Sequence, residues 1–380
     1  MTPQTSAPRA TLFDPIRIIL TLLVIIHHAS ITYGGGGDWY YKEAGAPEWT
    51  RNLLSILTAT DQSFFMGFFF LLAGYLTPVS LARKGETAYL GERLWRIGFP
   101  MLIFGHLLQP VTVALSRAAQ GSDFWATLQM LFAHGEFGLG PLWFYQALIL
   151  CAVAWCFAPR CQTGFLSRLW PTNFHAQIAL LAILTSLFAF TLRLAVPVGQ
   201  NLIGMQIGYF GSYIVLFVTG ALVARNRLLE NITWSQAWPW LVVSALTFPT
   251  LWAYAIFGGA FEGSSWRGGW SLPALCYASW EPFVAAGIIL GMLAFFRSWR
   301  GSGSAFCQRL GEASFIAFII HAPLVVAASW LVQDLAAQLM QRFLLAAPLA
   351  CLASFTLGDV LTRALACWKM KRSASSRQTA

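Results

Sequence analysis

The sequence predicts an all-α polytopic membrane protein with about ten transmembrane helices, and two observations lead to that prediction. The 380 residues are 57% hydrophobic and 10% charged, with a mean hydropathy of +0.61, whereas a soluble domain carries about 25% charged residues. Apolar segments long enough to cross a bilayer as a helix recur along almost the whole chain. We therefore expect a single membrane domain.

The predicted segments follow one another in order, with polar connections between them. The polar run 1–11 leads directly into the first segment without a small-residue cleavage site, so we expect this helix to be retained. The second segment is longer than a bilayer requires, which predicts a tilt or an extension outside the membrane. The ten segments are 12–33, 53–80, 96–116, 141–158, 175–195, 205–224, 236–257, 275–296, 314–332 and 344–366.

Lysine and arginine gather in every second connection, which predicts the topology. By the positive-inside rule these connections face the cytoplasm, so both termini are expected there, in a multi-pass protein of the cell inner membrane. The net charge of +9 is spread between apolar segments, so we expect no nucleic-acid partner. The basic clusters are Arg83 with Lys84, Arg93 with Arg96, Arg160 with Arg168, Arg225 with Arg227, Arg297 with Arg300 and Arg309, and Lys369, Lys371, Arg372 and Arg377.

We expect one transmembrane domain over residues 1–370, followed by a cytoplasmic tail at 371–380 whose serine-rich composition predicts disorder. The seven cysteines are an odd number and fall mostly in apolar segments or predicted cytoplasmic loops. This distribution does not indicate a disulfide framework.

The first segment carries two ionisable residues, Arg17 and His28, in FDPIRIILTLLVIIHHAS. Eleven residues make close to three helical turns, so the two side chains lie about 20° apart around the axis and about 16 Å apart along it. A charge at the centre of a spanning helix costs roughly 2.5–3.5 kcal/mol and therefore usually faces a protein interior or a wet cavity. The spacing predicts a functional site on this helix face.

We expect His28 to perform the chemistry. With Arg17 at the cytoplasmic interface, His28 lies about 16 Å deep in a hydrocarbon layer of about 30 Å, within reach of both faces. Apolar surroundings favour the neutral imidazole, which can act as a general base on a hydroxyl. Two alternatives stay open: an acyl-histidine intermediate, and a structural ring bonded between helices.

Two neighbours of this pair have different expected roles. Asp14, three residues before Arg17, lies on the same face and is expected to pair with the arginine. His27 points about 100° away from His28 and is the weaker candidate.

A second cluster, Arg93 and Arg96 in ERLWRIGFP, enters the third segment from the predicted cytoplasmic side. Spaced by three, the two guanidiniums project from one helix face and suit the oxygens of a phosphorylated donor. The alternative is an ordinary topological signal. Pro100 should kink the helix and make room for a ligand.

Two further buried ionisable residues stand in later segments. Glu281 in YASWEPFVAAG could orient the catalytic imidazole or bind an acceptor hydroxyl, or be a protonated structural carboxyl. His321 in FIAFIIHAPL is expected to be a supporting residue rather than a second base. We expect Asp61 and His106 to be structural.

Motifs of other chemistries are missing from the sequence. It has no HExxH, no paired CxxC, no glycine-rich phosphate loop after a strand and no GxSxG elbow. We therefore expect no metal site and no bound cofactor.

Several segments give the chain a clear resemblance to the acyltransferase 3 family of integral-membrane O-acyltransferases. The spacing of ten residues between arginine and histidine matches Arg17 with His28 rather than His27. The matching segments are FDPIR at 13–17, FFMGFFFLLAGYLTP at 64–78, ERLWRIGFP at 92–100, PLWFYQALI at 141–149, YFGSYIVLFVTGALV at 209–223 and GEASFIAFIIHAPL at 311–324.

The resemblance implies a ten-helix core that passes an acyl group, such as acetyl or succinyl, from cytoplasmic acyl-CoA to a hydroxyl of an extracytoplasmic glycan or glycolipid. It implies that Arg17 and His28 are essential and that Arg93 and Arg96 contact the donor's phosphates. Many relatives carry an extra periplasmic hydrolase-like domain. Because this chain ends after the tenth predicted helix, we expect it to resemble the stand-alone subgroup, which includes enzymes that succinylate periplasmic glucans.

Two other function classes fit the buried ionisable residues. A small-molecule transporter or flippase would use them along a substrate path, although no inverted repeat is visible between the halves. A sensor that binds a ligand without turnover is the third possibility. The acyl group, the acceptor and the oligomeric state are not determined by the sequence.

Overall fold

The computed structural model describes residues 12–158 and 172–378, apart from 260, 262, 264 and 336. These residues are nearly all helical and contain no strand, only an isolated bridge between Leu202 and Met205. The all-α prediction is thus confirmed. The basic residues Arg160 and Arg168 of the topology argument lie outside the described residues.

Nine helical stretches of the described chain are long and apolar enough to cross a membrane. All ten predicted segments coincide with helices, but the helical stretch at the sixth segment, 205–224, covers only Ile207–Val223 and is shorter than a full span. The spanning stretches are Phe13–Thr32 (α1), Glu48–Lys84 (α2), Glu86–Ala118 (α3 to α5), Gly140–Phe157 (with α7, Trp143–Phe157), Phe174–Ala195 (α9), Trp234–Gly258 (α11), Leu272–Ser298 (α12), Ala305–Val332 (α13) and Leu339–Trp368 in α14.

The observed helices differ from the predicted segments at three places. The sixth segment is α10, Phe210–Val223, and a short apolar helix that we did not predict, α6, spans Phe124–Ala133. Helix α14 runs over Leu339–Gln378, past residue 370 where we placed the end of the domain. The division of the chain at that residue and the cytoplasmic position of both termini stay predictions.

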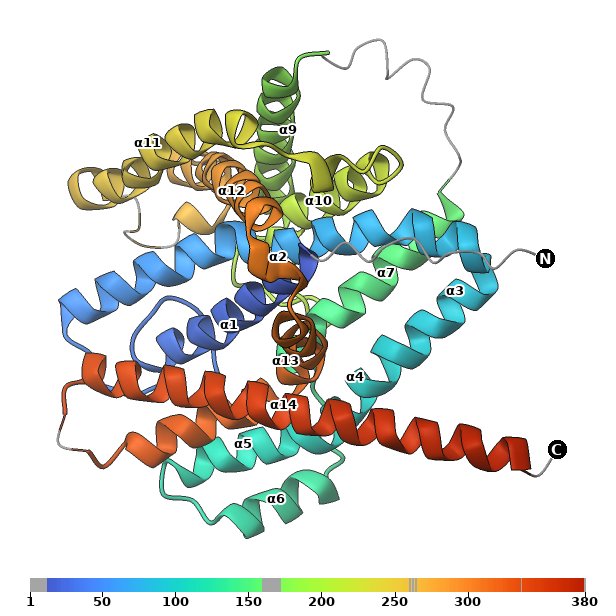
Figure 1. Ribbon diagram of the computed structural model, residues 1–380. Coiled ribbons are helices and arrows are strands. Elements are labelled where there is room, and N and C mark those ends of the chain that lie inside the picture. The colour runs from blue at the N-terminus through green and yellow to red at the C-terminus, as the bar shows by residue number, and fades with distance from the viewer. Residues whose placement is uncertain are drawn as a thin grey trace.

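Helix α1 occupies the middle of the fold. It packs against α2, α13 and α14, while α10 and α12 pack on the other part of α2 and on α9. In Figure 1, α2 and α14 cross the whole width of the molecule. The turn between α2 and α3 and the end of α14 lie at the right, and the loop after α1 lies at the left with the connection between α13 and α14. The two ends of α1 therefore face opposite ends of the molecule.

Glycines allow α2 and α10 to approach each other closely. A Cβ atom on Gly220 would lie 2.1 Å from the carbonyl oxygen of Leu71, and one on Gly74 would lie 2.0 Å from that of Phe217. Real Cβ atoms do not approach backbone this closely, so both positions need glycine. Small residues at such contacts are the usual means by which membrane helices pack.

We expect Gly220→Ala to destabilise the protein by about 1–3 kcal/mol or more, because the added methyl group overpacks the contact with α2. Gly91→Ala is the matched control: this helical glycine has open space around its Cβ position, and alanine is favoured over glycine in a helix by about 1 kcal/mol. Thermal unfolding in detergent should show opposite shifts for the two variants. Equal melting temperatures would contradict the close-packing argument.

Two π-helical turns interrupt the third spanning stretch. They cover Leu94–Gly98 and Phe104–Leu108, between α3 (Glu86–Arg93), α4 (Phe99–Ile103) and α5 (Gln109–Ala118). Each turn ends two residues before a proline, Pro100 or Pro110. Proline has no N–H to donate and its ring clashes with the carbonyl four residues earlier, so the helix widens there. The predicted distortion at Pro100 is therefore a π turn.

Candidate functional site

Three flat rings stack beside one another at the second half of α1. The imidazole of His28 lies 3.8 Å from the indole of Trp39 and 5.3 Å from the imidazole of His321, measured between ring centroids, with interplanar angles of 15° in both pairs. His28 comes from α1, Trp39 from the loop after α1, and His321 from α13. The fold thus brings together two histidines that are nearly 300 residues apart in the sequence.

His321 is fully buried and its protonation is fixed by the backbone. Its Nδ1 lies 2.6 Å from the carbonyl oxygen of Phe318. A carbonyl oxygen can only accept, so Nδ1 carries a proton, and Nε2 is an acceptor whenever the ring is neutral. The backbone of α13 therefore leaves Nε2 as the ring nitrogen without a partner among the described residues.

The stack contains buried polar atoms with unused hydrogen-bonding capacity. Nδ1 of His28, Nε2 of His321 and Nε1 of Trp39 are all buried and have no partner among the described residues. A buried polar atom without a partner costs about 1–3 kcal/mol. A catalytic role or an ordered water or ion is the usual explanation for such an atom in a native structure.

The loop that carries Trp39 is tied down on both sides. The hydroxyl of Tyr40 bonds Gln109 of α5, and the amide N–H of Glu43 donates to the carbonyl oxygen of Thr32 at 2.8 Å. The carboxylate of Glu43 pairs with Arg342 of α14 at 2.8 Å. Trp39 is consequently held against His28 by contacts to three helices.

The neighbouring histidine faces a different element. His27 is buried, packs on Phe65 and lies with its Nδ1 3.8 Å from a carboxylate oxygen of Asp61 in α2. The two histidines of α1 therefore have separate surroundings, as the 100° turn between consecutive helical residues requires. His28 alone joins the ring stack.

Asp14 and Arg17 form the pair that their spacing predicts. The Nη1 atom of Arg17 lies 3.3 Å from Oδ1 of Asp14, whose side chain is 1% exposed. Gly311 of α13 permits this arrangement, because a Cβ atom there would lie 2.8 Å from the Cβ atom of Asp14. The pair belongs to the first turns of α1, well away along the axis from the ring stack.

Arg93 and Arg96 have different surroundings despite their regular spacing. The guanidinium of Arg93 lies over the ring of Tyr89, 5.3 Å from its centroid. Arg96 is within the first π turn, has a 72% exposed side chain and contacts Glu92 at 3.2 Å. Glu92 also pairs with Lys84. Both arginines lie on the stretch that follows the turn between α2 and α3.

Glu281 lies in a separate buried cluster with a residue that we did not predict, Arg193 of α9. The Nη2 atom of Arg193 lies 2.6 Å from Oε2 of Glu281, and their side chains are 1% and 6% exposed. Arg193 also donates from Nε to the carbonyl oxygen of Gly208 at 2.9 Å and lies over the rings of Tyr209 and Tyr277. The contacts of Glu281 are thus to this cluster, whereas His28 contacts Trp39 and His321.

The ring stack has the groups that acid–base chemistry uses. An imidazole on a helix, with a second imidazole and an indole N–H beside it, can act as a base when neutral and offers hydrogen-bond partners for a reacting group. Arg17, Arg93 and Arg96 offer cationic groups that can bind an anion.

A family described as an acyltransferase domain matches residues 12–363. The chain is also similar to curated proteins named glucans biosynthesis protein C, including those from Salmonella schwarzengrund and Salmonella typhi. Both are 29% identical over 148 residues, which is 38% of this chain and 37% of the relative. The match thus spans little more than a third of those relatives.

Proposed function

Because this chain belongs to the acyltransferase 3 family, we propose that it moves an acyl group from cytoplasmic acyl-CoA to a hydroxyl of an extracytoplasmic glycan or glycolipid, in the cell inner membrane. Family membership makes the protein an acyltransferase, and its many apolar helices make it a multi-pass membrane protein. Relatives named for glucans biosynthesis support a glycan as the acceptor. The ring stack around His28 is the observation on which the proposal depends.

In the proposed reaction His28 acts as the general base. It takes the proton of the acceptor hydroxyl while the oxygen attacks the thioester carbonyl carbon. The carbon–sulfur bond then breaks, and the imidazolium returns the proton to the departing CoA thiolate. The products are an ester on the acceptor and free CoA, so atoms and charge balance without a metal or a redox partner.

The other predicted site residues would bind or position the two substrates rather than take part in the proton transfer. Arg17, about 16 Å from His28 along α1, is too far to touch the reacting carbonyl and would position the donor, with Asp14 offsetting its burial. Arg93 and Arg96 would hold the donor's phosphates by charge-assisted hydrogen bonds. His321 would accept a hydrogen bond at Nε2 and so orient the acceptor, whereas Glu281 supports the fold through Arg193.

The proposal is tested by incubating the purified full-length protein with radiolabelled acetyl-CoA or succinyl-CoA and a glucan. Release of CoA together with labelled glucan supports it. Accumulation or transport of a solute across proteoliposomes without CoA release would support the transporter or flippase alternative instead. Binding of a ligand without either result would indicate a sensor.

We expect Trp39→Ala to lower kcat about ten- to hundredfold with little change in the donor KM, because the indole fixes the plane of the His28 ring and small misplacements of a catalytic group are costly. Trp39→Phe should restore much of the loss, since a flat ring remains. The control is Tyr41→Phe, which removes the hydrogen bond from the Tyr41 hydroxyl of the same loop to Gln333. An equal loss in both Trp39 variants would contradict the stacking role.

A further inference from the structure

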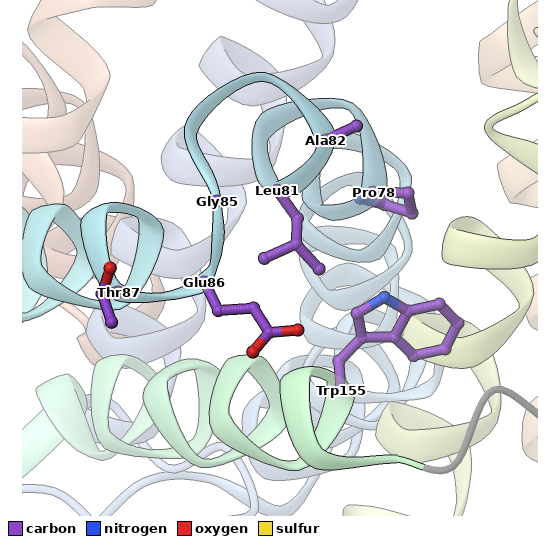
Figure 2. A pocket seen from close by; sticks show the side chains of 7 residues that line it. All are labelled: Pro78, Leu81, Ala82, Gly85, Glu86, Thr87 and Trp155. Atoms are coloured by element: carbon purple, nitrogen blue, oxygen red, sulfur yellow. The ribbon is translucent and has the colours of Figure 1, made fainter.

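A cavity of about 650 Å³ opens beside the turn between α2 and α3. Its wall is formed by the last turns of α2, the first residues of α3 and Trp155 near the end of α7. This volume falls within the 300–1,000 Å³ typical of small-molecule sites. Figure 2 shows the indole of Trp155 reaching from α7 toward Pro78, with the carboxylate of Glu86 between α3 and α7.

The lining offers two groups that complement a purine base. An indole provides a flat face on which a base can stack, and the edge of Trp155 already packs on Phe217 at 6.3 Å between ring centroids. A carboxylate is an acceptor only, so Glu86 can accept a hydrogen bond from the exocyclic amino group of adenine. The indole and the carboxylate thus complement the flat face and the amino group of adenine.

The position of the cavity connects it to Arg93 and Arg96. Glu86 begins α3 and Arg93 ends it, so the two lie about 10 Å apart along the helix. Helix α7, which carries Trp155, packs against α3 and against the π turn that holds Arg96. A base in the cavity would therefore place its ribose and phosphates along α3 toward the two guanidiniums.

We infer that this cavity is the subsite for the adenine of the acyl-CoA donor, with Trp155 stacking on the base and Glu86 accepting a hydrogen bond from its amino group. This inference rests on the proposed function, because it takes acyl-CoA as the donor. It adds a base-specific contact to the phosphate contacts of Arg93 and Arg96. It also places recognition of the donor's adenine at the turn between α2 and α3.

The test measures binding rather than turnover, with adenosine 3′,5′-bisphosphate as the probe and the full-length protein in detergent. Trp155→Ala should weaken binding roughly tenfold or more, and Trp155→Phe should retain most of it, because a base–aromatic stack is lost only in the first. The matched control is Trp95→Ala, since Trp95 is 67% exposed and stacks on Phe99 outside the cavity. Glu86→Ala should reduce the preference for the adenine probe over purine riboside 3′,5′-bisphosphate, which lacks the amino group.

The outcomes separate this inference from the proposed function. Equal probe affinity in wild type, Trp155→Ala and Trp95→Ala would overturn the subsite, even where labelled acyl-CoA still supports acyl transfer. Wild-type binding that depends on Trp155, without any acyl transfer, would support an adenine nucleotide site while contradicting the proposed reaction. Loss of binding in Trp155→Phe as well as Trp155→Ala would also count against stacking, provided that both variants elute as monodisperse protein.

Discussion

His28→Ala is expected to reduce acyl transfer by a factor of about 10² to 10⁴ or to abolish it, since this is the contribution of a positioned general base. The protein should still express and elute from size exclusion as the wild type does, because the imidazole of His28 makes ring contacts but its Nδ1 has no hydrogen-bond partner among the described residues. The measurement is labelled product formed per molecule of purified protein under donor-saturating conditions.

His27→Ala provides the comparison within the same helix. His27 is the adjacent histidine, but it lies against Phe65 and Asp61 rather than in the ring stack. We expect this change to affect stability more than turnover, because it removes the partner of a buried carboxylate. Normal product formation by His28→Ala, or an equal loss of turnover in both variants of comparable stability, would exclude His28 as the base.

The second large effect, on stability, is expected for the buried ion pair between Arg193 and Glu281. Glu281→Ala should destabilise the protein by about 3–5 kcal/mol, because it leaves the guanidinium of Arg193 in a buried position without its carboxylate partner. Thermal unfolding of the purified protein in detergent measures this loss. Truncating one partner is costly mainly because the other charge remains buried.

A double variant separates the charge from the packing. Arg193→Met combined with Glu281→Leu removes both charges while keeping apolar volume, and replacing a buried pair in this way is often neutral or stabilising. We therefore expect the double variant to unfold at a higher temperature than Glu281→Ala. If the double variant were as unstable as the single one, the loss would come from packing around Tyr209 and Tyr277 rather than from the uncompensated charge.

The helices were predictable because a bilayer imposes length and apolarity on every span. All ten predicted segments coincide with helices, and only at the sixth, 205–224, is the helical stretch, Ile207–Val223, shorter than a span. Its tight contact with α2 through Gly74 and Gly220 depends on two helices that are distant in the sequence. Apolar length alone carries no information about such pairings, so the shorter helix was predicted as an ordinary span.

The candidate site was predictable only where spacing within one helix determines it. The pairing of Asp14 with Arg17, and the separation of His27 from His28, follow from helical geometry. The stacking of Trp39 and His321 on His28 needs the tertiary fold. Arg93 and Arg96 have different surroundings, and a π turn, which their spacing does not reveal, begins between them.

Arg193 was missed although the sequence contains a signal for it. The residue lies two positions inside the end of the predicted segment 175–195, and an ionisable residue within a span usually has a partner in another span. Glu281 carries the opposite charge near the predicted outer end of its own segment. Matching such residues by depth and sign would have suggested the pair that the structure contains.

The packed rings also bear on the membrane's role as a barrier. An enzyme that receives one substrate from each compartment must avoid an unbroken file of water, through which protons and other ions would leak. Trp39, His28 and His321 stack closely where α1, its following loop and α13 meet. Under the proposed function, this packing would oppose a continuous file of water at that point.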